Sequence, residues 1–334
     1  VTMQQEHPFA EYIRILGKGR NGSRGLSASE SYNAMKMILN DEVEPVQLGA
    51  FLMLMRVKEE TGIEVAAAVK AIKETLATPV GTPEVDLDWS SYAGKKRVLP
   101  WYLLSTLLMA DNGIRIFMHG ASGHTAGRIY TKNVLPELGM AIATTMEQAA
   151  EQLESNNFAY MDLEHLSGKM HEIIEMRPLL GLRSPVHTIA RMLNPFNAEY
   201  VMQGIFHPGY QPTLQEAGII LEIPHMAVIK GEGGEIERNP DHKLTIQSVH
   251  NGEMIDEEWP PIFSQRHIRT NNADLNTADL KRVWSGECRD EYAEETIKGT
   301  VAVTLYMMGR AANREEAERQ AKEMWDSRNK KRFV

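Results

Sequence analysis

A polar, glycine-rich stretch from residue 119 to residue 127 is the part of the sequence best suited to bind a ligand. His119 and Gly120 directly follow the apolar, β-branched run 114–118, and residues 132–138 have a helical pattern. A strand, a polar loop and a helix in this order bring backbone N–H groups to the edge of a parallel sheet, where anions bind. The stretch is therefore either a binding loop beside His119 and Gly120 or an ordinary turn between a strand and a helix.

Two arginines form a second candidate for anion binding. Arg177 and Arg183 stand six residues apart in RPLLGLR, just before the helical pattern 185–193 that contains Arg191. Arginine pairs in a bidentate manner with carboxylate and phosphate groups, so these side chains could hold an anion. The alternative is that they pair with neighbouring glutamates on the surface.

An acidic stretch, MAVIKGEGGEIE, follows later in the chain and ends an apolar run with Glu232, Glu235 and Glu237. Carboxylates at the end of a strand suit Mg²⁺, which prefers oxygen ligands. The same composition also occurs in acidic loops that hold no metal. The sequence contains no phosphate-binding loop of the Walker type, no HExxH and no GxSxG motif.

Composition limits the classes of function. The chain has 334 residues, 43% of them hydrophobic and 24% charged, with a formal net charge of −9. This charge gives no global positive field for nucleic acid or an anionic membrane, although a local patch could still supply one. Cys288 is the only cysteine, which excludes an internal disulfide and fits a reducing compartment. No signal pattern or membrane-length apolar run occurs, so we expect a soluble, cytoplasmic protein without membrane contact.

The first part of the chain, residues 8–77, has helical patterns throughout. Ser27 and Glu30 have the spacing of a capping box, and Pro45 stands where a helix accepts proline in its first turn. Helices are predicted over 8–16, 27–39, 63–76 and from residue 45 onward. The segment TPVGTP at 78–83 cannot continue a helix, so it predicts a hinge-like boundary.

From residue 85 onward, strand and helix patterns alternate. Strands are predicted at 97–99, 114–118, 158–161, 200–205, 219–221 and 226–230. Helices are predicted at 100–109, 131–138, 146–153, 163–176, 185–193, 213–217, 291–308 and 314–327. This order predicts the α/β class, with a small all-helical amino-terminal domain joined to a larger α/β domain.

Four motifs carry a likeness to a known family. They are the block RGLSASESYNAMKMILNDEVEPVQLGAFLMLMRVKEE, the pair His119-Gly120 after its strand, RPLLGLR followed by MLNP, and KGEGGE after a late strand. On these motifs the chain resembles the anthranilate phosphoribosyltransferase family, glycosyltransferase family 3, over nearly its whole length. The resemblance implies a mainly parallel central sheet and a homodimer. It also implies a helical domain of residues 1–80 plus about 163–195, and an α/β domain of about 81–162 plus 196–334.

The chain departs from the family's pattern on the side that holds diphosphate. The family's GTGGD loop should lie between Asp86 and Trp101, where only Gly94 remains. The family's Asn-Ile-Ser-Thr falls on residues 100–103, and its Lys-His-Gly-Asn becomes residues 118–121, of which only the central pair is kept. Its paired acidic metal ligands become Gly234-Glu235, which leaves Glu235 as a weak candidate for binding a possible Mg²⁺ ion.

The acceptor side is better preserved. By the same resemblance, Arg177 matches the arginine that orients the anthranilate carboxylate, and Arg183 matches a second arginine. Phosphoribosyl transfer needs backbone donors and Mg²⁺ to hold the leaving diphosphate, so we do not expect efficient transfer. The pattern is most like the family's divergent second group, in which nucleic-acid binding has been proposed. The basic residues that could serve it are Lys18, Arg20, Arg24, Lys95, Lys96, Arg97, Arg128, Arg183 and Arg191.

Three interpretations of function follow. The first is a glycosyltransferase that uses a phosphoribosyl or related donor, with a phosphorylated sugar or another anion in the crevice between the domains. The second is a homodimer that binds nucleic acid without sequence specificity on a catalytically silent scaffold. The third is a dimer that binds a small anion or has a structural role.

Overall fold

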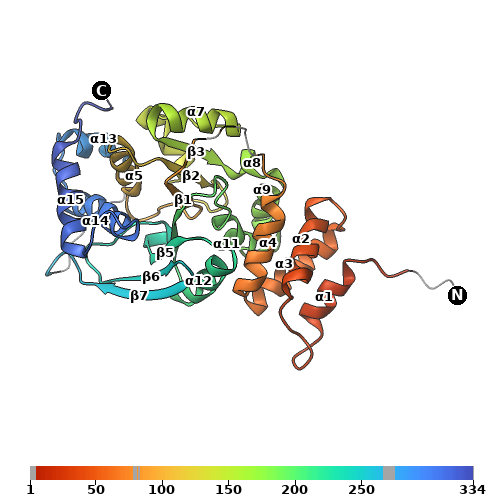
Figure 1. Ribbon diagram of the computed structural model, residues 1–334. Coiled ribbons are helices and arrows are strands. Elements are labelled where there is room, and N and C mark those ends of the chain that lie inside the picture. The colour runs from red at the N-terminus through yellow and green to blue at the C-terminus, as the bar shows by residue number, and fades with distance from the viewer. Residues whose placement is uncertain (1–4, 78–80, 82, 266–274, 334) are drawn as a thin grey trace.

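The computed structural model describes residues 5–77, 81, 83–265 and 275–333. A group of helices built from the amino-terminal segment lies beside a larger part that contains a sheet (Figure 1). Most of the predicted boundary at 78–83 lies outside the described residues. Among the described residues, no helix combines the length and the apolar character needed to cross a membrane.

The four predicted amino-terminal helices are confirmed. Their bounds are α1 Ala10–Gly17, α2 Ala28–Leu39, α3 Pro45–Lys58 and α4 Gly62–Lys73. The side chain of Ser27 accepts a hydrogen bond from the backbone N–H of Glu30, and the Glu30 carboxylate accepts one of 2.8 Å from the backbone of Ser27. This capping box satisfies two N–H groups that the helix itself leaves without partners.

A seven-stranded sheet, in the order β3-β2-β1-β4-β5-β6-β7, forms the centre of the larger part. The five strands from β3 to β5 in this order are parallel, and β6 and β7 are antiparallel. The mainly parallel α/β sheet beside a helical domain is therefore confirmed. The strands are β1 Leu87–Ser91, β2 Ile116–Gly120, β3 Phe158–Asp162, β4 Tyr200–Ile205, β5 His225–Lys230, β6 Leu244–His250 and β7 Glu253–Trp259.

Successive residues of the strands point to opposite faces and build two hydrophobic cores. Ile116 and Met118 belong to the core on the side of α5, α14 and α15, whereas Phe117 belongs to the core that also contains the amino-terminal helices. The helices of the first side are α5 Tyr102–Asp111, α13 Ala278–Ser285, α14 Glu291–Met307 and α15 Arg314–Ser327, and those of the second side include α7 Met146–Asn156 and α12 Gln211–Ile220.

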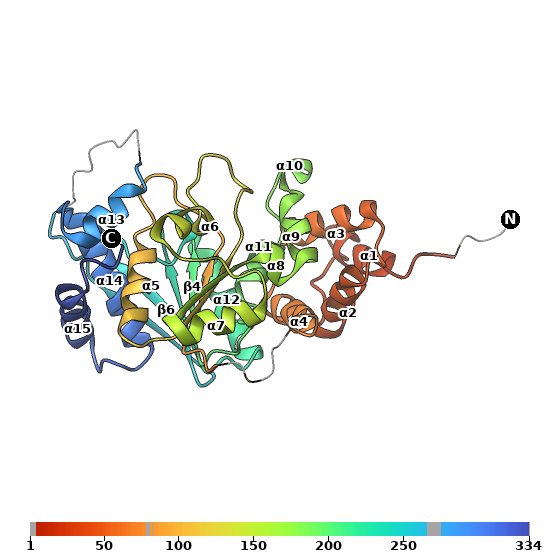
Figure 2. The same ribbon diagram turned by 90° about the horizontal axis from the view of Figure 1, so that it is seen from above.

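A group of short helices lies between the sheet and the amino-terminal helices (Figure 2). It consists of α8 Leu163–Leu166, α9 Gly168–Glu175, α10 Arg177–Leu180 and α11 Val186–Arg191. Helix α11 packs against both α4 and α9. One hydrophobic core runs from α1–α4 through these helices to the sheet, so the predicted division of the chain into domains at residues 163 and 195 stays a prediction. The remaining short elements are α6 Thr131–Val134 and the 3-10 turns at 136–138, 208–210 and 232–234.

Two predicted strands are wrong. Residues 97–99 form a loop, and the strand of this region is β1, whose polar residues hid it from the sequence pattern. These polar residues are satisfied inside the sheet, since Ser90 donates a hydrogen bond of 3.1 Å to Gln203 and Asp88 lies beside His119. The predicted strand 219–221 is the end of helix α12.

The hairpin of β6 and β7 was not predicted. Its turn is Asn251-Gly252, with φ angles of 48° and 86°. Two successive residues with positive φ make a turn whose twist matches that of the flanking strands, and Asn-Gly is its favoured sequence. The signal was therefore present in the chain.

Candidate functional site

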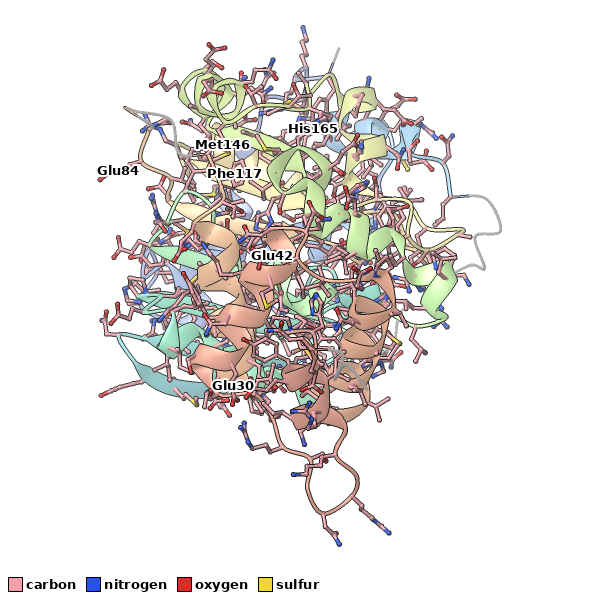
Figure 3. The ribbon with its side chains drawn as sticks, turned by 90° about the vertical axis from the view of Figure 1, so that its right-hand side faces the viewer. Glu30, Glu42, Glu84, Phe117, Met146 and His165 are labelled. Carbon is pink, nitrogen blue, oxygen red and sulfur yellow. The ribbon has the colours of Figure 1, made fainter. Side chains whose placement is uncertain are left out.

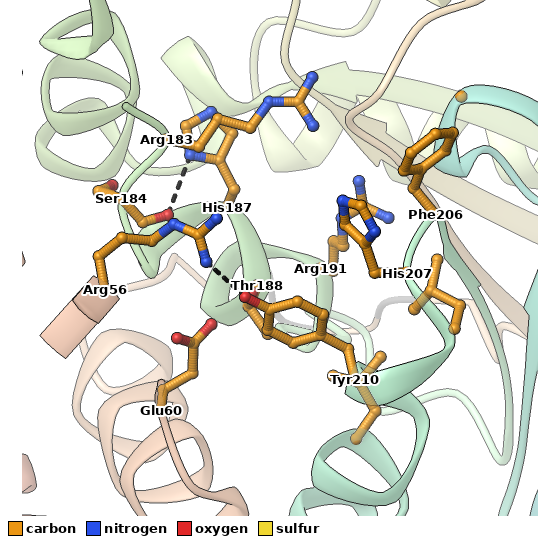
Figure 4. Close-up of a pocket in the computed structure, with 13 residues that line it drawn as sticks. Arg56, Glu60, Arg183, Ser184, His187, Thr188, Arg191, Phe206, His207 and Tyr210 are labelled. Carbon is orange, nitrogen blue, oxygen red and sulfur yellow. Dashed lines mark hydrogen bonds between the residues drawn. The ribbon is translucent and has the colours of Figure 1, made fainter. Parts of the chain in front are cut away.

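The parallel strands end with their carboxyl ends toward a cavity of about 150 Å³ between the sheet and the helices (Figure 4). Arg56 and Glu60 reach it from α3 and the residues that follow, and Arg183, His187 and Arg191 reach it from the region of α11. The loops that follow β4 and β5 close the remaining side. A crevice at the carboxyl ends of parallel strands is where α/β proteins bind their ligands.

Arginines dominate the electrostatics of this site. Burial, together with repulsion by Arg128, Arg191 and Arg177, lowers the pKa of Arg183 to about 10. Arg177 donates a hydrogen bond of 2.8 Å to the carbonyl of His124, and Arg191 donates one of 3.0 Å to the carbonyl of Gly234. The structure therefore brings Arg128 together with Arg177, Arg183 and Arg191, which lie in a different segment of the sequence.

None of these four arginines has an ion pair with a carboxylate among the described residues. Arg128 donates to the carbonyl oxygens of Ala93 and Gly94, at 2.9 and 3.1 Å. Arg183 makes one long contact, of 3.4 Å, to the hydroxyl of Thr125. Partly buried cations that repel one another and have only neutral partners favour the binding of an anion.

Two histidines lie among the arginines with their rings 5.0 Å apart, His124 and His187. Burial is the main cause that lowers the pKa of His124 to about 4, and the nearby Arg183 and Arg177 lower it further. Burial also lowers the pKa of His187 well below its ordinary value, with further contributions from His124 and Arg183. Both rings are therefore neutral at physiological pH.

The loop after β1 is occupied by a carboxylate of the protein itself. Glu235 is buried, and its Oε1 accepts hydrogen bonds of 2.8 Å from the backbone N–H of Ala93 and 2.6 Å from that of Gly94. Gly94 has a φ of +68°, and its carbonyl leaves no space for a side chain at Gly233 on the facing loop. The two loops therefore pack directly on each other, and the loop amides at Ala93 and Gly94 are engaged.

Glu235 alone does not form a metal site. One of its oxygens already accepts two N–H bonds, so a metal ion could use only the other oxygen, which has no hydrogen-bond partner among the described residues. Mg²⁺ needs several oxygen ligands in octahedral geometry. The part of the chain that the structure describes contains no group of three or more His, Cys, Asp or Glu residues that could hold a metal ion.

Lys95 was expected to contact phosphate, but it lies in the interior of the protein. Its side chain is fully buried, and its ammonium group pairs with Glu237 at 2.6 Å and with Glu232 at 3.0 Å. Burial disfavours the charged form, but the two carboxylates outweigh this effect and raise the pKa of Lys95. The neighbouring Lys96 and Arg97 are exposed. Of the three basic residues predicted here, only these two face solvent.

His119 and Gly120 also differ from the expectation, because both are buried and neither lines the cavity. His119 lies between Asp88, at 3.1 Å from Nε2, and the hydroxyl of Tyr92, at 2.8 Å from Nδ1. A Cβ atom on Gly120 would lie 1.9 Å from the carbonyl oxygen of Ser91. This glycine is needed for the close approach of neighbouring backbones.

The basic residues of the α1–α2 loop lie apart from the cavity. Lys18, Arg20 and Arg24 are exposed, and Arg24 pairs with Glu30 at 2.7 Å. Figure 3 shows this loop projecting beyond the helices, below the labelled Glu30. The loop therefore offers exposed positive charge at the outer end of the helical part and does not add to the arginine cluster.

Among the residues of the cavity wall that sequence reasoning missed are Arg56, Glu60 and Tyr210. Arg56 donates a hydrogen bond of 2.5 Å to the hydroxyl of Tyr210, 154 positions further along the chain. The only local signal was that Arg56 directly follows the apolar stripe of α3 and departs from its pattern. The contact between α3 and the loop before α12 cannot be read from spacing in the sequence.

Comparison with known proteins identifies related chains. Residues 10–76 match the model of the glycosyl transferase family, helical bundle domain, and residues 102–329 match that of the glycosyl transferase family, a/b domain. An uncharacterized protein of Aquifex aeolicus is 26% identical over 316 residues, which cover 93% of this chain and 96% of that protein. The anthranilate phosphoribosyltransferase of Caldivirga maquilingensis is 28% identical over 294 residues, 85% of each chain.

Solved structures show the same fold at lower identity. The anthranilate phosphoribosyltransferase of Thermus thermophilus has a TM-score of 0.80 at 21% identity, over 96% of this chain and 95% of that one. The Saccharomyces cerevisiae enzyme in complex with PRPP and Mg has a TM-score of 0.79 at 17% identity, over 99% and 98% of the two chains. The chain thus belongs to this glycosyl transferase family, among relatives that include anthranilate phosphoribosyltransferases.

Proposed function

We propose that this chain binds a small anion, such as a phosphorylated small molecule, in the arginine-lined cavity and is not an efficient anthranilate phosphoribosyltransferase. The observation that carries the proposal is the cluster of four arginines, whose hydrogen-bond partners among the described residues are backbone carbonyls and a hydroxyl. In agreement with this, burial and the other three arginines lower the pKa of Arg183 to about 10. An anion in the cavity would relieve this repulsion and supply the partner that the cations lack.

The occupied loop after β1 supports the second half of the proposal. Phosphoribosyl transfer requires donors that stabilise negative charge on the departing diphosphate. Here the N–H groups of Ala93 and Gly94 already bind the carboxylate of Glu235. A diphosphate at this place would compete with that carboxylate and be repelled by it. Among the described residues, no cluster of His, Cys, Asp or Glu could hold the Mg²⁺ ion that accompanies a diphosphate.

A titration with ribose 5-phosphate tests the binding. We expect saturable binding to the purified protein, and at least tenfold weaker binding to Arg183→Gln, because one charge-assisted contact is lost. The matched control is Arg319→Gln, which removes an exposed arginine of α15 that pairs within its own helix. Equal affinity of the Arg183 and Arg319 variants would contradict a site in this cavity.

An activity assay tests the absence of efficient transfer. With phosphoribosyl diphosphate, Mg²⁺ and anthranilate, we expect turnover far below the order of 1 s⁻¹ that is usual for enzymes. Turnover at an ordinary enzymatic rate would mean that other donors hold the diphosphate. It would restore the interpretation of the chain as a phosphoribosyl-type glycosyltransferase.

Nucleic-acid binding is the second candidate, favoured by exposed basic residues at two places. Lys96 and Arg97 lie on the loop after β1, and Lys18 and Arg20 lie on the α1–α2 loop. None of the four has an ion pair among the described residues, so their charge is available to phosphates. The net charge of −9 opposes a general attraction and would confine binding to such patches.

The salt dependence of DNA binding tests this second candidate. If the patch after β1 contacts the phosphate backbone, then the double variant Lys96→Ala, Arg97→Ala should have lower affinity for both single-stranded and duplex DNA. The slope of log affinity against log salt should flatten by roughly 0.7 to 0.9 for each lost contact. Arg177→Ala is the control. The guanidinium of Arg177 donates a hydrogen bond to the carbonyl of His124, so its loss should not change the affinity for DNA. An unchanged slope, or no binding at low salt, would eliminate this surface.

A homodimer is part of the same proposal. Helix α3 exposes Val46 and Val57, at 80% and 78%, and Leu179 on α10 is 88% exposed. Leu180 of α10 lies next to Gly49 of α3, so these exposed side chains belong to neighbouring helices. Apolar side chains gathered on adjacent helices are typical of an interface between subunits.

A further inference from the structure

The cavity contains polar atoms whose hydrogen-bonding capacity is not used. Nε2 of His187, Oγ of Ser184 and Oε2 of Glu60 are buried and have no hydrogen-bond partner among the described residues. All three residues line the cavity, and their exposures are only 7%, 4% and 5%. Buried polar atoms in proteins nearly always have a partner, so these atoms indicate groups that a bound molecule would supply.

The hydrogen bonding of His187 fixes what its free nitrogen can do. Nδ1 lies 3.2 Å from the carbonyl oxygen of Ser184 (Figure 4). A carbonyl oxygen only accepts hydrogen bonds, so Nδ1 carries the hydrogen. In a neutral imidazole the other nitrogen is then an acceptor. Nε2 of His187 therefore presents a lone pair to the cavity and needs an N–H or O–H donor from its partner.

The surroundings keep this ring neutral. The charged or titratable groups that act on it are His124, Arg183 and Arg191, and each of them opposes a proton on His187, as does burial. Glu60 adds a second acceptor to the same cavity, through the lone pairs of its buried Oε2. The cavity thus combines the cations Arg56, Arg183 and Arg191 with two acceptors.

We infer that the anion of this cavity carries its own O–H donor, which His187 accepts, so that the site selects a protonated oxyanion over one without a proton. This inference rests on the proposed function, since it names the chemistry of the anion that the arginines bind. An oxyanion without a hydrogen would bind to the arginines equally well. It would, however, place its lone pairs against those of His187 and Glu60.

Inorganic phosphate and sulfate are matched probes for this selection. Both are tetrahedral oxyanions of similar size, but at neutral pH phosphate retains at least one O–H group and sulfate retains none. Because a buried acceptor without a partner is costly, we expect phosphate to bind roughly tenfold more tightly than sulfate, or better. Calorimetric titration of the wild-type protein with each anion measures the ratio.

Variants test whether His187 causes the preference for phosphate over sulfate. His187→Phe keeps a ring but removes the acceptor, so we expect weaker phosphate binding, sulfate binding no weaker than in the wild type, and a ratio near one. His187→Gln retains an acceptor oxygen and should restore part of the preference. Arg183→Gln should lower the affinity for both anions by the same factor and leave the ratio of the phosphate and sulfate affinities as in the wild type.

The outcomes separate this inference from the proposed function. If both anions bind equally to the wild-type protein, or if His187→Phe leaves the preference for phosphate unchanged, the inference is overturned and the proposed function stands. If neither phosphate, sulfate nor ribose 5-phosphate binds, the proposed function fails and the inference fails with it. The wild-type ratio decides the matter even if a variant does not fold.

Discussion

Glu235 holds Gly94 in place through a hydrogen bond of 2.6 Å from the backbone N–H of Gly94 to the carboxylate, across 141 positions of the chain. The same oxygen accepts the N–H of Ala93. A buried carboxylate that bridges two loop amides fixes the loop after β1 against the loop after β5. In this arrangement the two N–H groups already have an acceptor.

The change Glu235→Gln should lower the free energy of unfolding by roughly 1–3 kcal/mol, because two charge-assisted hydrogen bonds become neutral ones. Urea denaturation of both proteins measures the difference. The exposed Glu287, which pairs only at the surface with Arg282, supplies the control Glu287→Gln. A loss no larger than that of the control would show that the carboxylate does not hold the loop.

Lys95 and Lys96 are adjacent and of the same type, which makes them a matched pair. Lys95→Met leaves Glu237 and Glu232 without their buried cation, so we expect a loss of about 3–5 kcal/mol in the free energy of unfolding. Lys96→Met, at an exposed position, should stay within about 0.5 kcal/mol of the wild type. Equal effects in denaturation experiments would contradict the buried position of Lys95.

The glycine of the predicted binding loop is instead a structural residue. Gly120→Ala should destabilise the protein by at least about 2–3 kcal/mol, because the new methyl group would overlap the carbonyl of Ser91 and the packed strands must shift. Gly168→Ala meets no atom within 4 Å at the start of α9, so we expect no loss there. Thermal unfolding distinguishes the two. A similar melting temperature for both variants would be the contrary result.

Acid should destabilise the protein through His124. Its folded-state pKa of about 4 lies below the ordinary value of 6.5, so the unfolded chain binds the proton more readily. The stabilisation is complete above about pH 6.5 and is lost as the pH falls toward 4, at about 1.4 kcal/mol per pH unit. The free energy of unfolding measured at several pH values should fall less steeply in His124→Gln. Parallel curves for the two proteins would exclude this role.

The apolar surface of α3 and α10 should hold two copies together. Val46→Asp combined with Leu179→Asp places charges on this surface, and sedimentation velocity should then report a monomer, with a dimer for the wild type. Met254→Asp, on the distant strand β7, should leave the dimer intact. A monomeric wild-type protein at micromolar concentration would contradict the proposal directly.

Features that depend on neighbouring residues could be predicted from the sequence. The capping box of Ser27 and Glu30 spans three residues, and Pro45 opens its helix because proline fits the first turn. The Asn251-Gly252 turn belonged to the same class and could have been read. The alternation of apolar strands and amphipathic helices was likewise sufficient to predict the α/β sheet.

Features that depend on distant partners could not be predicted in this way. Lys95 has the sequence context of an exposed basic cluster, but its partner Glu237 lies 142 positions away. Strand β1 contains Asp88 and Ser90, whose burial is possible only because His119 and Gln203 lie opposite. Arg56 enters the cavity wall because α3 packs near Tyr210. In each case a long-range contact decides whether a polar residue faces solvent.

The interlocked charges of the two loops also limit how the site can change over generations. Replacing Lys95 by an uncharged residue leaves Glu237 without its ion-pair partner in the interior, and replacing Glu235 by an apolar residue leaves the N–H groups of Ala93 and Gly94 without an acceptor. A change that frees the loop amides for another ligand therefore costs stability unless other residues change with it. The contact between the two loops thus couples the binding properties of the site to the stability of the fold.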